Sequence, residues 1–232
     1  MVIDVYKVKI PHQLDNWVLE KAVDNLTANH KEKILSLRKK DDQIRSLFGS
    51  LLIKKLQNEL RIVSDIEINY YGKPYFKDNN ATFFNISHSK DYVICAIASQ
   101  PVGIDIEYIK PIDFSICEFI FSEKEKSTFS SLSKKDKLNY LLLIWTLKES
   151  YLKMMGIGLN LELHRLSVTI RNENISLFLN GFKEAAYFHS TKIENSYYLS
   201  ICVNKSFQKV NIHEICNNDL ITSILPNISN LP

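Results

Sequence analysis

Residues 102–107 read "VGIDIE", and this short stretch decides the fold and the chemistry expected of the chain. It follows the apolar run "YVICAIAS" and is expected to form a strand, with Asp105 and Glu107 on one side. Ile104 and Ile106 then project to the other side, into a core. A buried carboxylate costs several kcal/mol unless a partner compensates for it. The stretch is therefore either a solvated strand face or a pair of acids that hold something positive.

A second polar unit, "WTLKESYLK" at residues 145–153, lies on a helix expected over about 137–155. That helix is apolar on nearly all sides, which is typical of a buried helix. Glu149 and Lys153 are one turn apart on the same row, and Lys148 lies beside them. Charges on a buried helix need compensation. The row therefore either lines a shared polar site or is an ordinary surface ion pair between Glu149 and Lys153.

Together the two units predict a cation site. Carboxylate oxygens suit Mg²⁺, which usually keeps water and substrate phosphates in its remaining positions. Asp105, Glu107 and Glu149 would hold the cation, and Lys148 and Lys153 would be available to bind phosphate. No serine or cysteine has the neighbours of an activated nucleophile, which points to transfer onto an outside acceptor or to hydrolysis. Further groups that could join the phosphate site are Lys33, Arg38, Arg45, Lys73, Ser87, His88 and Ser89.

The order of the apolar patterns predicts an α+β fold. Helices are expected at about 15–29, 41–60 and 137–155, with strands in segments such as "IEINYYGKPYF" and "ATFFNISHSKDYVICAIAS". "KKDD" and "KKDK" both open helices, and "YVICAI" and "YLSICV" both end strands, each pair about a hundred residues apart. Two matched α+β halves, 1–101 and 102–232, would explain this echo, with chance similarity as the alternative.

The composition argues against several classes of protein. Of the 232 residues, 45% are hydrophobic and 24% are charged, which is ordinary for a soluble globular protein. The net charge of +3 is too small and dispersed to indicate nucleic-acid binding, although it suits a phosphate-rich ligand or an acidic protein partner. The four cysteines form no C-x-x-C pair, and the sequence has neither a signal peptide nor an apolar run of membrane length. We therefore expect a reduced, cytoplasmic protein.

The paired signature "GIDIE" and "WTLKESYLK", about forty residues apart, resembles that of the Sfp-type 4′-phosphopantetheinyl transferases. The resemblance continues through "YGKPYF", "FNISHS" and "FSEKE", in the family's order, over about residues 30 to 160. It implies two similar α+β halves in a pseudo-twofold arrangement, with the active site at their interface. It also implies Mg²⁺-dependent transfer of the 4′-phosphopantetheine arm of coenzyme A to a serine of an apo acyl or peptidyl carrier protein, with release of 3′,5′-ADP.

The resemblance further implies roles for single residues. Asp105, Glu107 and Glu149 would bind Mg²⁺ on the pyrophosphate of coenzyme A. Glu149 would also be the base for the incoming serine, and Lys153 would stabilise charge on the pyrophosphate. Glu125 matches a recurrent acid that is either a structural cap or an aid to the chemistry. His30 falls where relatives often carry lysine. The expected contacts to coenzyme A are Lys33, Arg45, Ser46, Lys73, Ser87, His88, Lys148 and Lys153.

Two other functions stay open from the sequence. A Mg²⁺-dependent phosphohydrolase could also place acids and lysines around a nucleotide-like pyrophosphate. A non-catalytic relative could bind coenzyme A or a carrier without turnover. By resemblance, the strands after Gly156 are expected to contribute to the carrier-binding face. The sequence leaves the carrier and its pathway undetermined, and two halves in one chain favour a monomer.

Overall fold

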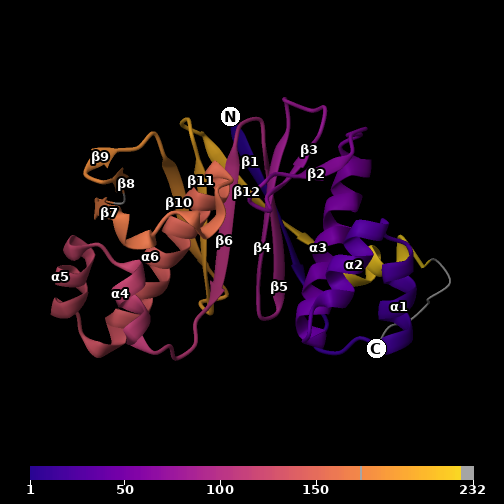
Figure 1. The fold of residues 1–232 in the computed structure, drawn as a ribbon, viewed down its shortest axis with the longest axis horizontal. Coiled ribbons are helices and arrows are strands. Elements are labelled where there is room, and N and C mark those ends of the chain that lie inside the picture. The colour runs from indigo at the N-terminus through magenta and orange to yellow at the C-terminus, as the bar shows by residue number, and fades with distance from the viewer. Residues whose placement is uncertain (173, 226–232) are drawn as a thin grey trace.

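Two β-sheets lie side by side in the middle of the molecule, and helices cover the outer side of each (Figure 1). The computed structural model describes residues 1–172 and 174–225. One apolar core lies between the sheets, with Ile3 and Ile94 from one sheet and Ile104 and Leu199 from the other. Two further cores lie between the sheets and their helices. The predicted α+β class with two halves is confirmed.

The first half is built on the sheet with strand order β12-β1-β5-β4. Its long helix α3 buries an apolar face that includes Leu47, Leu51 and Leu52. The helix expected over 15–29 is in fact two helices, because Thr27 has an extended backbone and starts a new helix after it. The elements are β1 (Val2–Lys9), α1 (Asn16–Asp24), α2 (Ala28–Ser36), α3 (Lys40–Glu59), β2 (Ile66–Ile68), β3 (Pro74–Phe76), β4 (Phe83–Ser89) and β5 (Tyr92–Ala98).

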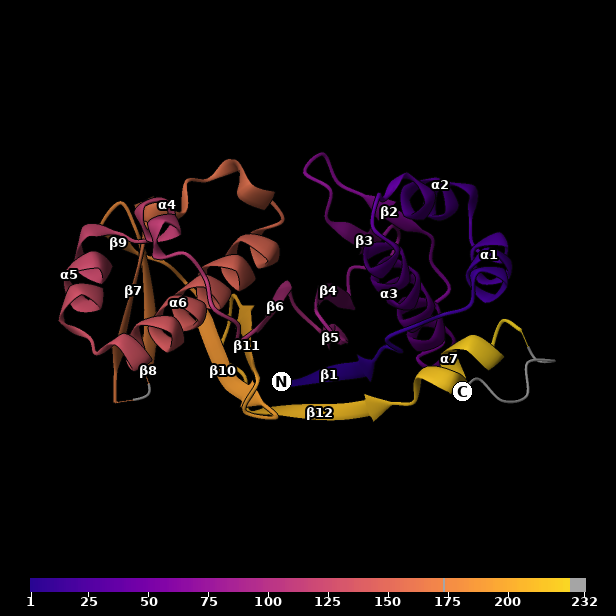
Figure 2. The same ribbon diagram turned by 90° about the horizontal axis from the view of Figure 1, so that it is seen from below.

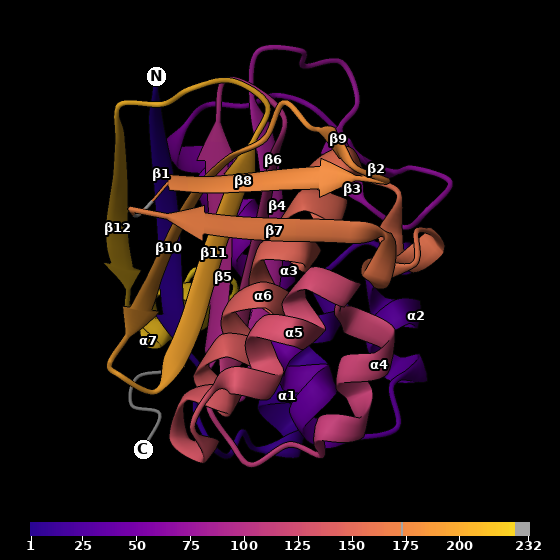
Figure 3. The same cartoon turned by 90° about the vertical axis from the view of Figure 1, so that its left-hand side faces the viewer.

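The second half is built on the sheet with strand order β10-β11-β6, and its long helix α6 packs on β6 and β11. A separate small sheet, β7-β8-β9, crosses over the outer side of this half (Figure 3). The elements are β6 (Val102–Tyr108), the 3₁₀ helix η1 (Phe114–Ile116), α4 (Cys117–Ile120), α5 (Glu123–Ser131), α6 (Lys134–Met155), the 3₁₀ helices η2 (Gly158–Asn160) and η3 (Leu163–Arg165), β7 (Leu166–Arg171), β8 (Asn174–Leu179), β9 (Phe182–Lys183), β10 (Tyr187–Ile193) and β11 (Tyr197–Val203).

The end of the chain returns to the first half. Strand β12 (Lys209–Ile215) pairs in parallel with β1, and the two run together in Figure 2. Helix α7 (Asn217–Thr222) then buries Leu220 and Ile221 in the core beneath α3. The structure therefore departs from the expected division at its end, because the second half does not run from 102 to 232. The last strand and helix complete the first half instead.

The two sheets meet along a seam, the line on which β4 and β6 lie side by side. Alternate side chains of β4 accept hydrogen bonds from alternate backbone N–H groups of β6, since alternate residues of a strand point to the same side. The seam is thus joined by side chains where a continuous sheet would have a backbone ladder. The three bonds are Ile104 N–H to Asn85 Oδ1 (2.9 Å), Ile106 N–H to Ser87 Oγ (3.4 Å) and Tyr108 N–H to Ser89 Oγ (3.0 Å).

Helix α6 lies unusually close to β6. It begins after Ser133, whose hydroxyl accepts the N–H of Asp136, and ends at Gly156, which has a left-handed backbone with φ of 69°. A Cβ at Gly103 would lie 1.9 Å from the carbonyl oxygen of Ser150, so only glycine permits this approach. Gly103 therefore allows α6, which carries Glu149, to approach the strand that carries Asp105 and Glu107. Among the residues that the structure describes, no helix has the length and apolar character needed to cross a bilayer.

Candidate active site

Asp105 is at the centre of a polar cluster on the seam. Its side chain is buried, and its Oδ1 accepts hydrogen bonds from Ser87 Oγ (2.9 Å) and Lys153 Nζ (2.6 Å). Lys153 also donates to Ser87 Oγ at 2.9 Å, which closes a three-membered network between β4, β6 and α6. Asp105 Oδ2 is buried without a hydrogen-bond partner. The aspartate is therefore held firmly by one oxygen and leaves the other free for a ligand.

The negative charge of Asp105 affects two further carboxylates, Glu107 and Glu149. Glu107 accepts a hydrogen bond from Ser89 Oγ at 3.1 Å, and burial together with the charge of Asp105 raises the pKa of Glu107 to about 7. Burial and the charges of Asp105 and Glu107 likewise raise the pKa of Glu149 to about 7. Glu149 lies one helical turn before Lys153, which binds Asp105, and the three predicted acids are called here the acid cluster (Asp105, Glu107 and Glu149).

The chemistry of the acid cluster suits a hard cation. It offers three carboxylates, and Asp105 Oδ2 is a buried oxygen without a hydrogen-bond partner. Lys153 binds the other oxygen of Asp105, Oδ1. Within residues 1–172 and 174–225, no three histidine, cysteine, aspartate or glutamate side chains are already arranged as a metal site. Lys153 instead holds Asp105 at 2.6 Å. A divalent cation would therefore compete with this ammonium for the aspartate.

Lys148 is not where the sequence suggested. Its side chain is fully buried, and its ammonium donates to Glu125 Oε2 (2.6 Å) and to the carbonyls of Ile120 (2.7 Å) and Leu163 (3.1 Å). An ammonium has three donors, and all three are used. The expectation that Lys148 binds phosphate is therefore wrong, because the segment between β6 and β7 covers this face of α6.

Lys73 and Ser87 are also engaged within the protein. Lys73 Nζ donates to the carbonyls of Val102 (3.1 Å) and Met154 (3.0 Å), and burial lowers the pKa of Lys73 to about 8. One of its donors is left for a ligand. Ser87 points to the seam, where its hydroxyl donates to Asp105 and accepts a hydrogen bond from Lys153.

The remaining expected contacts line a cavity on the other side of β4. His88 alternates with Ser87 along the strand and faces a cavity of about 250 Å³, lined also by Lys33, Arg45 and Ser46. Arg45 donates to Asp42 Oδ1 at 2.6 Å. Desolvation, helped by the charges of Lys153 and Arg45, lowers the pKa of His88. The structure thus brings these four residues together, next to the acid cluster.

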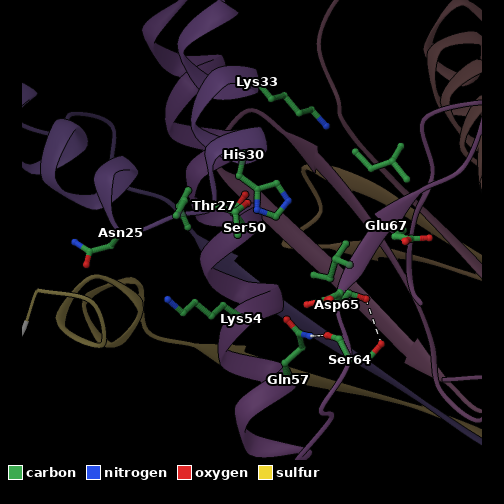
Figure 4. Close-up of a pocket in the computed structure, with 13 residues that line it drawn as sticks. Asn25, Thr27, His30, Lys33, Ser50, Lys54, Gln57, Ser64, Asp65 and Glu67 are labelled. Carbon is green, nitrogen blue, oxygen red and sulfur yellow. Dashed lines mark hydrogen bonds between the residues drawn. The ribbon is translucent and has the colours of Figure 1, made fainter. Parts of the chain in front are cut away.

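A larger cavity of about 700 Å³ adjoins the first and shares His30, Lys33 and Ser50 with it. Figure 4 shows Lys54 and Gln57 along α3, and Gln57 Nε2 donates to the carbonyl of Ser64 at 2.8 Å. Asp65 comes directly before β2, and Glu67 lies on it. Glu67 is already paired with Lys77 at 2.8 Å.

The sequence reasoning missed two positioning roles on the seam, those of Asn85 and Ser89. Asn85 and Ser89 bind the backbone of β6, and Ser89 also donates to Glu107. The signal was present in "NISHS", because Asn85, Ser87 and Ser89 follow the same alternation as Asp105 and Glu107.

Comparisons with known proteins agree with this geometry. Residues 101–202 match the model of the 4′-phosphopantetheinyl transferase superfamily, and residues 13–101 match a model described as 4′-phosphopantetheinyl transferase, N-terminal. The chain is 30% identical over 226 residues to the 4′-phosphopantetheinyl transferase gsp of Aneurinibacillus migulanus, covering 93% of this chain and 94% of that relative. It belongs to the 4′-phosphopantetheinyl transferase superfamily.

Two further similarities extend the comparison. The transferase is 30% identical over 203 residues to the 4′-phosphopantetheinyl transferase Sfp of Bacillus subtilis (strain 168), covering 85% of this chain and 91% of Sfp. The predicted Sfp-type family is thereby confirmed, over a longer stretch than residues 30 to 160. Among solved structures, a holo-[acyl-carrier-protein] synthase of Thermotoga maritima matches with a TM-score of 0.39 and 21% identity, over 47% of this chain and 64% of that chain.

Proposed function

We propose that this transferase moves the 4′-phosphopantetheine arm of coenzyme A to a serine hydroxyl of an apo acyl or peptidyl carrier protein, releases 3′,5′-ADP and requires Mg²⁺. The observation that carries the proposal is the acid cluster. Asp105 binds Lys153, Glu107 and Glu149 complete the acid cluster, and a cavity lined by Arg45 and His88 lies on the other side of β4. Acids for a cation and bases for phosphates are the parts that transfer from a pyrophosphate needs.

The acid cluster would hold Mg²⁺, which when bound would supply positive charge to offset the charge of the pyrophosphate. Lys153 would leave Asp105 and donate to the phosphate oxygens, where it would stabilise the charge that develops as the anhydride breaks. The cavity lined by His88 would take the nucleotide end of coenzyme A, with Lys33, Arg45 and Ser46 as contacts. Lys73 has one donor left for a ligand. These residues would orient the substrate and form no covalent bond to it.

Glu149 would accept the proton of the carrier serine. A carboxyl with a pKa of about 7 is a suitable general base near neutral pH. The serine Oγ forms a bond to the phosphorus that bears the pantetheine arm, and the bond from that phosphorus to the bridging oxygen breaks. The electron pair of that bond leaves with 3′,5′-ADP, and the serine proton passes to Glu149. The carrier thus brings the nucleophile that the chain itself lacks.

The test is a panel of acyl and peptidyl carrier proteins incubated with coenzyme A and Mg²⁺, followed by intact-protein mass spectrometry. We expect at least one carrier to gain the mass of the phosphopantetheine arm, and Glu149→Gln to abolish the gain. Glu20→Gln, a change of the same kind at an exposed site on α1, is the matched control. Loss of coenzyme A without any carrier would favour a phosphohydrolase, and binding without turnover would favour a non-catalytic relative.

We further propose that the transferase acts as a cytoplasmic monomer without nucleic-acid partners. Both halves of the site lie in one chain, since β4 and β6 meet within it, so no second copy is needed to complete the acid cluster. Analytical ultracentrifugation at micromolar concentration tests the monomer, and a wild-type dimer would contradict this proposal.

A further inference from the structure

Glu125 and Lys148 form an ion pair that solvent does not reach. Their side chains are 1% and 0% exposed, and Lys148 Nζ lies 2.6 Å from Glu125 Oε2. Glu125 Oε2 also accepts the N–H of Ser122 at 2.8 Å, and its Oε1 accepts the N–H of Val168 at 2.6 Å. Every polar atom of the pair has a partner, which is the condition under which a buried ion pair is tolerated.

The pair connects α6 to four other elements. Lys148 reaches the end of α4 at Ile120 and the 3₁₀ helix η3 at Leu163, while Glu125 belongs to α5 and binds β7 at Val168. Figure 3 shows these elements gathered around α6 on the outer side of the second half. The ion pair therefore joins α6 to the layer of segments that covers the helix.

Such an ion pair can fix the rotation of α6 around its own axis. The helix buries apolar residues around most of its circumference, and the hydrophobic effect is non-directional, so it fixes the rotation of the helix less sharply than polar contacts do. An ammonium with three fixed acceptors resists a rotation, because the rotation would leave buried charges without partners. Contacts on the opposite face, where Ser150 touches Gly103 and Thr146 Oγ1 lies 2.8 Å from Ser200 Oγ, hold the helix against its sheet.

Glu149 follows Lys148 directly on the same helix. Side-chain tips lie about 5–6 Å from a helix axis, so a rotation of about 10° would move the Glu149 carboxylate by about 1 Å. A misplacement of about 1 Å at a reacting group can lower a rate about 100-fold. We propose that the Glu125–Lys148 pair is a positioning device that fixes the rotation of α6 and so aims Glu149 at Asp105 and Glu107. This inference rests on the proposed function of the acid cluster.

The test removes both charges together with the double variant E125Q/K148Q, whose amides can still donate and accept hydrogen bonds. We expect kcat to fall about 100-fold, while KM for coenzyme A changes less than about twofold. We also expect the affinity for Mg²⁺ alone, measured by calorimetry without coenzyme A or carrier, to fall about tenfold. The exposed pair Glu118–Lys126, with a distance of 2.7 Å, supplies the matched control E118Q/K126Q, which should behave as wild type.

A cycle with Glu149→Gln distinguishes positioning from a purely structural role. Because the pair acts through Glu149, adding E125Q/K148Q to Glu149→Gln should cause little further loss of kcat. Losses that multiply would overturn the proposal. So would an increased KM for coenzyme A at unchanged kcat, which would mean that Lys148 acts on the substrate, or wild-type values throughout.

Two provisions keep the test decisive. If E125Q/K148Q does not fold, Lys148→Arg keeps the charge but enlarges the head group; lower kcat at unchanged KM supports the proposal, and wild-type kcat overturns it. If the wild-type chain modifies no carrier, the proposed function fails by itself. The comparison of Mg²⁺ affinity between wild type and variant still decides whether the pair positions the acid cluster.

Discussion

Replacement of Glu149 by glutamine should stabilise the protein while it abolishes transfer. In the folded chain the pKa of Glu149 is raised to about 7 by burial and by the charges of Asp105 and Glu107. In the unfolded chain it returns to its ordinary value of 4.5. Between these values the unfolded chain is ionised and the folded one is protonated, so the free energy of unfolding falls as pH rises through this window. Glutamine has no charge and does not suffer this loss.

The size of the effect follows from the shift. A difference between 4.5 and about 7 corresponds to about 3 kcal/mol, at about 1.4 kcal/mol for each pH unit. Glu149 is partly exposed, and screening by solvent reduces the expected value to about 2 kcal/mol at pH 8. For a chain of this length, that is a rise in Tm of about 4–8 °C. Well below pH 4.5, where both states are protonated, the difference should nearly vanish.

The assay is thermal unfolding of wild type and Glu149→Gln at pH 5, 6, 7 and 8 in EDTA, with Glu20→Gln as the exposed control. We expect the two curves to separate progressively above pH 5, and Mg²⁺ at pH 8 to stabilise the wild type more than the variant. A variant that is less stable at pH 8, or a difference that does not depend on pH, would refute the reasoning. Glu107 remains in the variant, so some pH dependence should persist.

Three other perturbations have clear expected outcomes. Asp105→Asn should abolish detectable Mg²⁺ binding in calorimetry, because it removes the carboxylate that has the free buried oxygen. Gly103→Ala should lower the free energy of unfolding by at least about 3 kcal/mol in urea titrations, because its Cβ would lie 1.9 Å from the carbonyl oxygen of Ser150; wild-type stability would show that α6 can move away. Deletion of residues 209–232 should yield insoluble protein, because it exposes one edge of β1 and removes Leu220 from the core; a soluble monomer with native circular dichroism would contradict this.

The acid cluster could be predicted because its two parts follow local periods. Asp105 and Glu107 are two apart on a strand, and Glu149 and Lys153 are four apart on a helix, so each pair must share a face. Lys148 could not be placed in the same way. Helical spacing gives its direction around α6, but whether that direction meets solvent depends on Glu125 and the segment that covers the helix.

The path of the chain end was also beyond local reasoning. Nothing in the pattern of residues 209–215 tells whether the strand adds to the nearer sheet or to β1, which lies about two hundred residues earlier in the sequence. Partner choice of this kind is decided by long-range packing. The helix expected over 15–29 was wrong for a local reason, since Thr27 is a good start for a new helix and a poor residue within one.

The return of β12 to β1 has a consequence for the order of assembly during translation. The amino-terminal half emerges first, yet its sheet and its core are completed only by β12 and α7, which are made about two hundred residues after β1. Until then β1 keeps one open edge, and such edges invite pairing with other chains. The half that is synthesised first is therefore completed only after the second half has been made, and until then the newborn chain carries an unprotected strand edge.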